Sequence, residues 1–145
     1  MMARIAVEGL DSLMADLETL IAMPDSVAET ILNAEADVIV TAQRSEIASR
    51  WRGPYSMGIS AKSVKKGKVK KTNDGHAVHV YPQGSRKRGK RSVRNAEIAF
   101  INEYGARERK IVPRPAIAAA NAKAEKPAAE AGEQVFNAYL DSKNL

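Results

Sequence analysis

Ten residues in the middle of the chain carry the strongest chemical signal in the sequence. The run SRKRGKRSVR, residues 85–94, contains six basic side chains and no acid. Clustered lysine and arginine side chains neutralise phosphate backbones, and such contacts require no reading of the base sequence. The chemistry available to this run is therefore the binding of a polyanion, either a nucleic acid or an acidic protein surface.

A second group of cations precedes this run. Residues 62–94 hold twelve Lys or Arg residues against one acid, so this third carries a charge of +11 and the rest of the chain −5. A basic middle between acidic ends favours a polyanionic partner or self-assembly through opposite patches. The residues that we predict to contact DNA or an acidic partner are Lys62, Lys65, Lys66, Lys68, Lys70, Lys71, Arg86, Lys87, Arg88, Lys90, Arg91 and Arg94.

Catalytic and metal chemistry receive little support from the residue types. His76 and His79 are the two histidines, and three positions apart on a strand they point to opposite faces. The absence of cysteine excludes thiolate ligands and thiol nucleophiles. No glycine-rich phosphate loop and no G-x-S-x-G motif occurs. We therefore expect no enzyme, no cofactor and no metal site.

Length and composition indicate which elements position these cations. A chain of 145 residues predicts one domain over 1–145, and an aromatic content of 5% predicts a core of aliphatic side chains and alanine. Such a core is typical of helix packing with a small sheet. No apolar run is long enough for a signal peptide or a membrane span, so we expect a soluble, cytosolic protein.

Periodicity divides the chain into predicted elements. Helical spacing of apolar residues predicts a first helix from about residue 11 and a long helix from 26 to 51, ended by Gly53-Pro54. Alternation from residue 59 to 64 and again around 78–80, on either side of the turn Asn73-Asp74-Gly75, predicts a β-hairpin. The basic residues 84–95, which contain Gly84 and Gly89, are then predicted to form a loop.

The last third of the chain reads as helical. A short helix is predicted to end at Gly105, followed by a C-terminal helix over 115–142 that is broken or kinked at Pro127. The predicted fold class is therefore α+β, with a long N-terminal helix packed on a small, mostly antiparallel sheet and a C-terminal helix.

One stretch resembles a known family. AFINEYGARERKIVPRPAIAAA, residues 99–120, is similar to the neck (tail-component, head–tail joining) proteins of long-tailed double-stranded DNA phages. The opening at Gly9 and the segment around Gly58 also resemble that family. The motif residues, which we expect to serve subunit packing, are Phe100, Glu103, Tyr104, Gly105, Pro113, Arg114 and Pro115.

The resemblance implies a structural virion protein without catalysis. It implies a homo-oligomeric ring in the phage neck that joins the head connector to the tail and surrounds the double-stranded DNA, assembled in the host cytoplasm. Other neck, connector or tail proteins would be its partners. We also expect Phe100 and Tyr104 to anchor the short helix against the long one. The alternative is a free, sequence-independent nucleic-acid-binding protein that uses the basic middle segment, and a weaker one treats RKRGKR as a targeting address.

Overall fold

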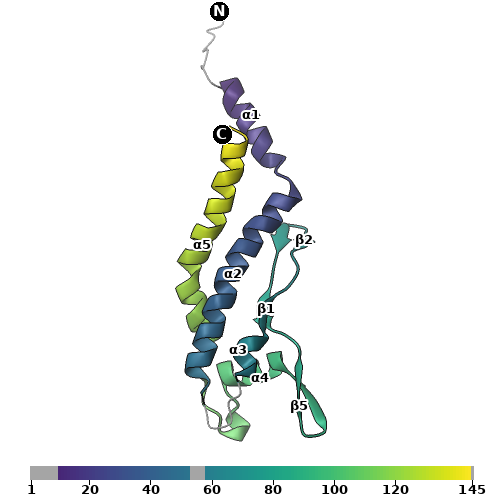
Figure 1. Ribbon diagram of the computed structural model, residues 1–145, viewed down its shortest axis with the longest axis vertical. Coiled ribbons are helices and arrows are strands. Elements are labelled where there is room, and N and C mark those ends of the chain that lie inside the picture. Colours follow the sequence, from purple (N-terminus) through teal and green to yellow (C-terminus); the bar gives the residue numbers. More distant parts are fainter. Residues whose placement is uncertain (1–9, 53–57, 145) are drawn as a thin grey trace, which may run out of the picture.

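The computed structural model describes residues 10–52 and 58–144, so Gly9 and Gly53-Pro54 lie outside the described residues. Two long helices run side by side, with β1 and β2 alongside α2. The short helices α3 and α4 and the strand β5 lie toward one end of the pair, and α1 projects from the other end (Figure 1). In chain order, the elements are α1 (Leu10–Ile21), α2 (Asp25–Arg50), α3 (Ile59–Ser63), β1 (Val64–Lys66), β2 (Lys70–Thr72), β3 (Gly75–Ala77), β4 (Val80–Pro82), β5 (Ser85–Arg88), β6 (Arg91–Arg94), α4 (Asn95–Tyr104), the 3₁₀ turn η1 (Arg107–Arg109) and α5 (Ile117–Ser142).

The antiparallel pairing of α2 and α5 forms the body of the molecule. Small residues recur every fourth position on α5 and are buried against α2, and they are Ala120, Ala124, Ala128 and Gly132. A row of small side chains at this spacing lets two helix backbones approach closely. Gln43 of α2 donates its amide to Asn121 of α5 at 3.0 Å across the pair. The predicted α+β class, the long helix and the C-terminal helix are all confirmed.

The predicted β-hairpin exists, but it begins later than expected. Its two arms pair as β1 with β4 and β2 with β3, and the loop between Thr72 and Gly75 holds the predicted turn residues. Residues 59–63, predicted as strand, form α3 instead. A backbone bond from Lys62 to Gly58 and a hydroxyl bond from Ser63 to the Ser60 carbonyl close this helical turn. Local hydrogen bonds of this kind compete with strand pairing.

The basic residues predicted as a loop form a second β-hairpin, β5–β6. Its two-residue loop is Gly89-Lys90, in which Gly89 has a φ of 64° and Lys90 is not among the described residues with positive φ. That combination matches a type II′ turn, whose twist suits two antiparallel strands. The prediction of a loop was wrong. Gly89 is the first residue of a hairpin turn and not part of an irregular segment.

The C-terminal helix also differs from its prediction. α5 begins at Ile117 rather than at residue 115, and it continues through Pro127 without a break. A proline inside a helix removes one backbone hydrogen bond. Ala124, three residues before Pro127, and Ala128, directly after it, are both buried where α5 packs on α2. Packing on α2 therefore holds the helix together where the isolated sequence predicts an interruption.

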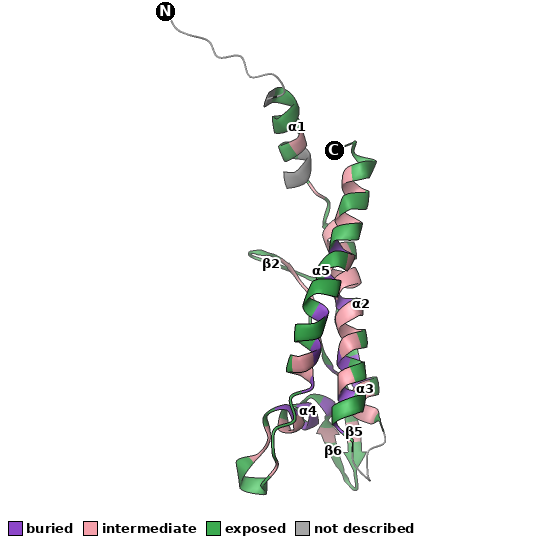
Figure 2. Ribbon diagram, turned by 90° about the vertical axis from the view of Figure 1, so that its left-hand side faces the viewer, coloured by how far each residue is buried: buried purple, intermediate pink, exposed green. Residues whose placement is uncertain are grey.

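The hydrophobic core lies at one end of the helix pair, where α4 and the strands meet it. Its members are Ile47, Trp51, Val64, Ala99 and Ala116. Figure 2 shows buried residues along the paired helices and in α4, while α1 and the outer faces are exposed. On α1 this exposure includes Leu13, Met14 and Leu17, each about half exposed.

Candidate functional site

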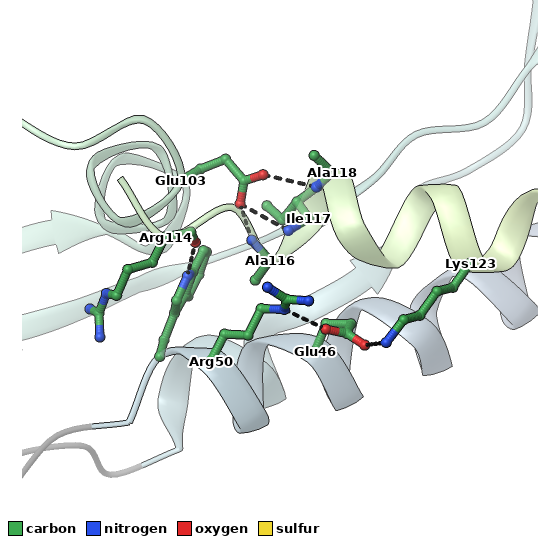
Figure 3. Close-up of polar contacts among 9 residues, drawn as sticks. Glu46, Arg50, Glu103, Arg114, Ala116, Ile117, Ala118 and Lys123 are labelled. Atoms are coloured by element: carbon green, nitrogen blue, oxygen red, sulfur yellow. Dashed lines mark hydrogen bonds and ion pairs between the residues drawn. The ribbon is translucent and has the colours of Figure 1, made fainter. Parts of the chain in front are cut away.

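The resemblance motif builds a buried clamp around the start of α5. Glu103 is 5% exposed, and its carboxylate accepts backbone N–H bonds from Ala116, Ile117 and Ala118, each at 2.8 Å (Figure 3). The first N–H groups of a helix have no partner within it, and the helix dipole favours negative charge there. No side chain at the N-cap position of α5 itself performs this role. Glu103 thus caps a helix other than its own.

Three further hydrogen bonds tie the same turn to the end of the long helix α2 and to α4. Trp51 donates its indole N–H to the carbonyl oxygen of Arg114 at 2.7 Å. The Arg114 backbone N–H bonds the Asn102 carbonyl at 2.8 Å, and its guanidinium bonds the Asn102 side chain at 2.7 Å. We call Trp51, Asn102, Glu103, Gly105 and Arg114 the Glu103 clamp.

Gly105 is required by the geometry of this clamp. Its φ of 75° and ψ of 179° lie in a region that is essentially restricted to glycine. A Cβ at this position would lie 2.6 Å from the Ile111 carbonyl oxygen and 2.9 Å from the ring of Pro113. Gly105 therefore lets α4 end and the chain turn back within contact distance of the segment that leads into α5.

Phe100 and Tyr104 do not anchor α4 on the long helix, so that expectation is corrected. They are 63% and 66% exposed, and their rings contact each other with centroids 4.8 Å apart. The face of α4 that turns inward presents Ile98, Ala99 and Glu103 instead. The two aromatic rings consequently form an apolar patch on the surface, and Pro113, Arg114 and Pro115 are also exposed.

The predicted contact cations fall into two structurally different groups. The first group lies along the β1–β4 and β2–β3 hairpin beside α2. Within it, Lys66 pairs with Asp37 at 2.8 Å and Lys71 with Asp25 at 3.4 Å, and both acids belong to α2. Acids of the long helix therefore offset part of this charge. The exposed lysines of this group for which no ion pair occurs among the described residues are Lys62, Lys65, Lys68 and Lys70.

The second group lies on the β5–β6 hairpin, at the opposite end of the molecule from α1 (Figure 1). Arg86 is turned back toward the body: its Nε donates to Asn95 Oδ1 at 2.7 Å, and Nη2 donates to Ser60 Oγ at 2.8 Å. Burial, and then the charge of Arg88, lower the pKa of the Arg86 guanidinium. The other hairpin cations are exposed, and they are Lys87, Arg88, Lys90, Arg91 and Arg94.

Glu46 of α2 forms an ion-pair network with both long helices. It bonds Arg50 of its own helix at 2.7 Å and Lys123 of α5 (Figure 3). Bonds to Lys123 first, and to Arg50 second, lower the pKa of the Glu46 carboxyl from its ordinary value. The network joins α2 to α5.

Residues 10–52 and 58–144 contain no group of side chains that could hold a metal ion and no helix that could span a membrane. His76 lies 3.2 Å from Asp25, but no group of three or more His, Cys, Asp or Glu side chains in those ranges could hold an ion. None of the helices described there is long and apolar enough to cross a bilayer.

Several residues of the site are absent from the sequence prediction. They are Trp51, Ser60, Asn95 and Asn102, and each holds a predicted site residue in place through a hydrogen bond. Asn95 is the first residue of α4 and follows directly after a basic strand, and polar side chains at helix starts commonly serve the backbone. Trp51 is the one tryptophan of the chain, and a buried indole usually needs an acceptor.

Comparison with known proteins gives no family. No family model matches the chain, and no curated protein or solved structure matches it either.

Proposed function

We propose that this chain is a structural subunit of a phage neck, forming a ring that joins the head connector to the tail around the DNA. The observation that carries the proposal is the surplus of accessible surface. A compact monomer of 15.7 kDa exposes about 7,300 Å², whereas this chain exposes 11102 Å². Surface of this extent favours a subunit whose faces are covered by neighbours.

The residues outside the described ranges do not account for the whole surplus. Those fifteen residues contribute at most roughly 2,400 Å², the area of a fully extended chain of their mass. The described residues therefore expose at least about 8,700 Å², against roughly 6,700 Å² for a compact protein of their size. The elongated helix pair and the projecting hairpins account for this difference.

Besides Tyr81 and Val112, the large exposed apolar side chains of the described residues fall into two groups, which suits contacts between different faces of neighbouring subunits. One group lies on α1, with Leu13, Met14 and Leu17, and the other is the pair Phe100 and Tyr104. Contacts between two different patches generate rings when the rotation between subunits closes. A ring is the assembly that the resemblance to neck proteins implies.

The Glu103 clamp also supports this proposal, because its residues Glu103, Gly105 and Arg114 belong to the motif that resembles neck proteins. The residues that resemble the neck family fix the angle between α4 and α5 through buried hydrogen bonds. A subunit that tiles a ring needs fixed angles between its contact faces. The proposal assigns no catalytic step to the chain, and it places the protein in the virion and, during assembly, in the host cytoplasm.

The native mass of the purified protein tests this proposal. We expect ring-sized particles by light scattering and native mass spectrometry, and we expect Phe100→Ser with Tyr104→Ser to reduce them to monomer. Tyr81→Ser is the matched control, since Tyr81 is an aromatic residue of β4 that is 47% exposed and belongs to neither group. A wild-type protein that is monomeric at every concentration and never copurifies with tails or capsids would contradict the proposal.

The second candidate is a free, sequence-independent nucleic-acid-binding protein. The observation that favours it is the row of exposed cations on β5–β6, for which no ion pair occurs among the described residues. Duplex binding by a monomer that forms no larger particle would select this candidate over the neck subunit.

A further inference from the structure

We propose that the β5–β6 hairpin, Ser85–Arg94, is a preformed element that binds the phosphates of duplex DNA. The inference rests on the proposed function for the location of that DNA, the channel of the ring. The residues of the hairpin itself indicate the contact, and they favour DNA over an acidic protein as the partner of these cations.

The pairing register concentrates positive charge that nothing in the described chain neutralises. Arg88 lies directly opposite Arg91 across the two strands, on the same face as Arg86. Like charges at directly opposed positions destabilise a strand pair. None of the five exposed cations of the hairpin has a carboxylate partner within 4.0 Å among residues 10–52 and 58–144. An external anion would relieve this repulsion.

The base of the hairpin is fixed, so the exposed cations are presented in a set arrangement. Asn95 is 5% exposed and joins three segments. It accepts from Arg86, its amide donates to the Gln83 carbonyl at 2.8 Å, and its backbone N–H bonds Gly84 at 2.9 Å. Arg86 is therefore a positioning residue that holds β5 against α3 and α4. A fixed element loses less conformational freedom on binding than a flexible loop.

The side chains of the hairpin favour DNA over a protein surface. Protein interfaces obtain their affinity from buried aromatic and apolar anchors. The hairpin contains one apolar side chain, Val93, which is half-buried, and it contains no aromatic residue. Arginine forks bind phosphate oxygens in pairs, and phosphate contacts need no apolar anchor. The composition therefore fits a phosphate backbone.

The geometry also favours a duplex over a single strand. Single-strand binding without sequence preference uses aromatic side chains on which bases stack, and the hairpin has none. The major groove of B-DNA, about 12 Å wide, admits a two-stranded β-ribbon. β5–β6 is such a ribbon, and it projects from the end of the molecule (Figure 1).

Duplex binding by two variants of equal charge tests the inference. The hairpin variant replaces Lys87, Arg88, Lys90 and Arg91 with Gln. The control variant makes the same change at four exposed lysines of the first group, Lys62, Lys65, Lys68 and Lys70. The probe is a mixed-sequence 30-base-pair duplex, with the same-length single strand and a poly-glutamate peptide as competitors, measured at several salt concentrations.

We expect wild type and the control variant to bind the duplex with similar affinity, and the hairpin variant to bind it at least about tenfold more weakly. Five phosphate contacts predict a slope of log affinity against log salt of about −4.5, and the loss of four reduces it to about −1. Equal weakening in both variants, or tighter binding of poly-glutamate than of the duplex, would overturn the inference.

The native mass of each protein separates this inference from the proposed function. Rings that do not bind the duplex contradict the inference and leave the neck proposal standing. A monomer that binds the duplex through the hairpin supports the inference and contradicts the neck proposal. The Arg86→Gln variant distinguishes positioning from contact, because we expect it to weaken binding mainly by loosening the hairpin, seen as faster amide exchange in β5 and β6.

Discussion

Gly132 of α5 lies directly against the side chain of Glu35 in α2. A Cβ built at Gly132 would lie 2.2 Å from Glu35 Oε1 and 2.8 Å from its Cγ. The Glu35 side chain therefore occupies the space that a Cβ at position 132 would need, and Gly132 continues the row of small residues that begins at Ala120.

Replacing Gly132 tests how tightly the helices are held together. Alanine favours a helix over glycine by about 1 kcal/mol, but here its methyl group collides with Glu35. We expect Gly132→Ala alone to leave the free energy of unfolding unchanged or lower it. In a Glu35→Ala background the same change should raise it by about 1 kcal/mol. Urea unfolding of the four proteins measures this coupling, and additive effects would show that the contact is unimportant.

Glu103 should contribute more to stability than an ordinary helix cap. Loss of an N-cap costs about 0.5–2 kcal/mol, and the buried, charged Glu103 carboxylate serves three backbone N–H groups. We expect Glu103→Ala to lower the free energy of unfolding by roughly 2–4 kcal/mol. Glu97→Ala, at an exposed position of the same helix, is the control and should cost less than about 1 kcal/mol. Faster amide exchange at residues 116–118 in the Glu103 variant would locate the effect.

Alanine substitutions at Gly105 and Gly58 distinguish the cost of a strained backbone from the cost of a steric clash. Both have positive φ, but a Cβ at Gly58 meets nothing within 4 Å while a Cβ at Gly105 lies 2.6 Å from a carbonyl oxygen. Gly58→Ala should cost about 1–2 kcal/mol from the left-handed backbone alone. Gly105→Ala should cost clearly more, or prevent folding. Thermal unfolding of both variants, with expression level as a second measure, checks the order, and equal losses would contradict the close approach.

The ion pairs of Glu46 predict a pH dependence whose sign is fixed. The pKa of its carboxyl is lowered in the folded protein, chiefly by Lys123 and then by Arg50. The resulting stabilisation is complete above the unfolded-state pKa of the carboxyl, and it is lost as pH falls through the lowered, folded-state pKa. NMR titration should show the Glu46 pKa rise toward its ordinary value in Lys123→Gln. Lys126→Gln, one turn further along α5, should leave it unchanged.

The sequence predicted those parts of the fold that depend on local pattern. The long helix follows from apolar residues at helical spacing and from Gly53-Pro54 after it, and the turn at Asn73-Asp74 follows from its residue types. The hairpin at 85–94 could have been predicted as well, because Gly-x in a two-residue loop is a known turn signal. The six cations of this run favour an irregular segment instead, because blocks of like charge are typical of disorder.

The clamp could not be predicted because its partners are distant in sequence. Glu103 bonds N–H groups thirteen to fifteen residues away, and Trp51 bonds a carbonyl sixty-three residues away. No local pattern reports such contacts. Phe100 and Tyr104 have the spacing of a buried helical pair, and only the placement of α4 shows that Ile98 and Ala99 face the core instead.

The pairing of α2 with α5 has a consequence for how the chain reaches its fold. Gln43 and Asn121, which bond across the pair, are 78 residues apart in sequence. At synthesis rates of 5–20 residues per second, α2 waits roughly 4–16 s after leaving the ribosome before its partner exists. Throughout that time its apolar stripe has no helix to pack on, and contacts this distant in sequence form slowly. Folding of the helix pair therefore waits until α5 has been synthesised, and until then the apolar stripe of α2 is open to contacts with other chains.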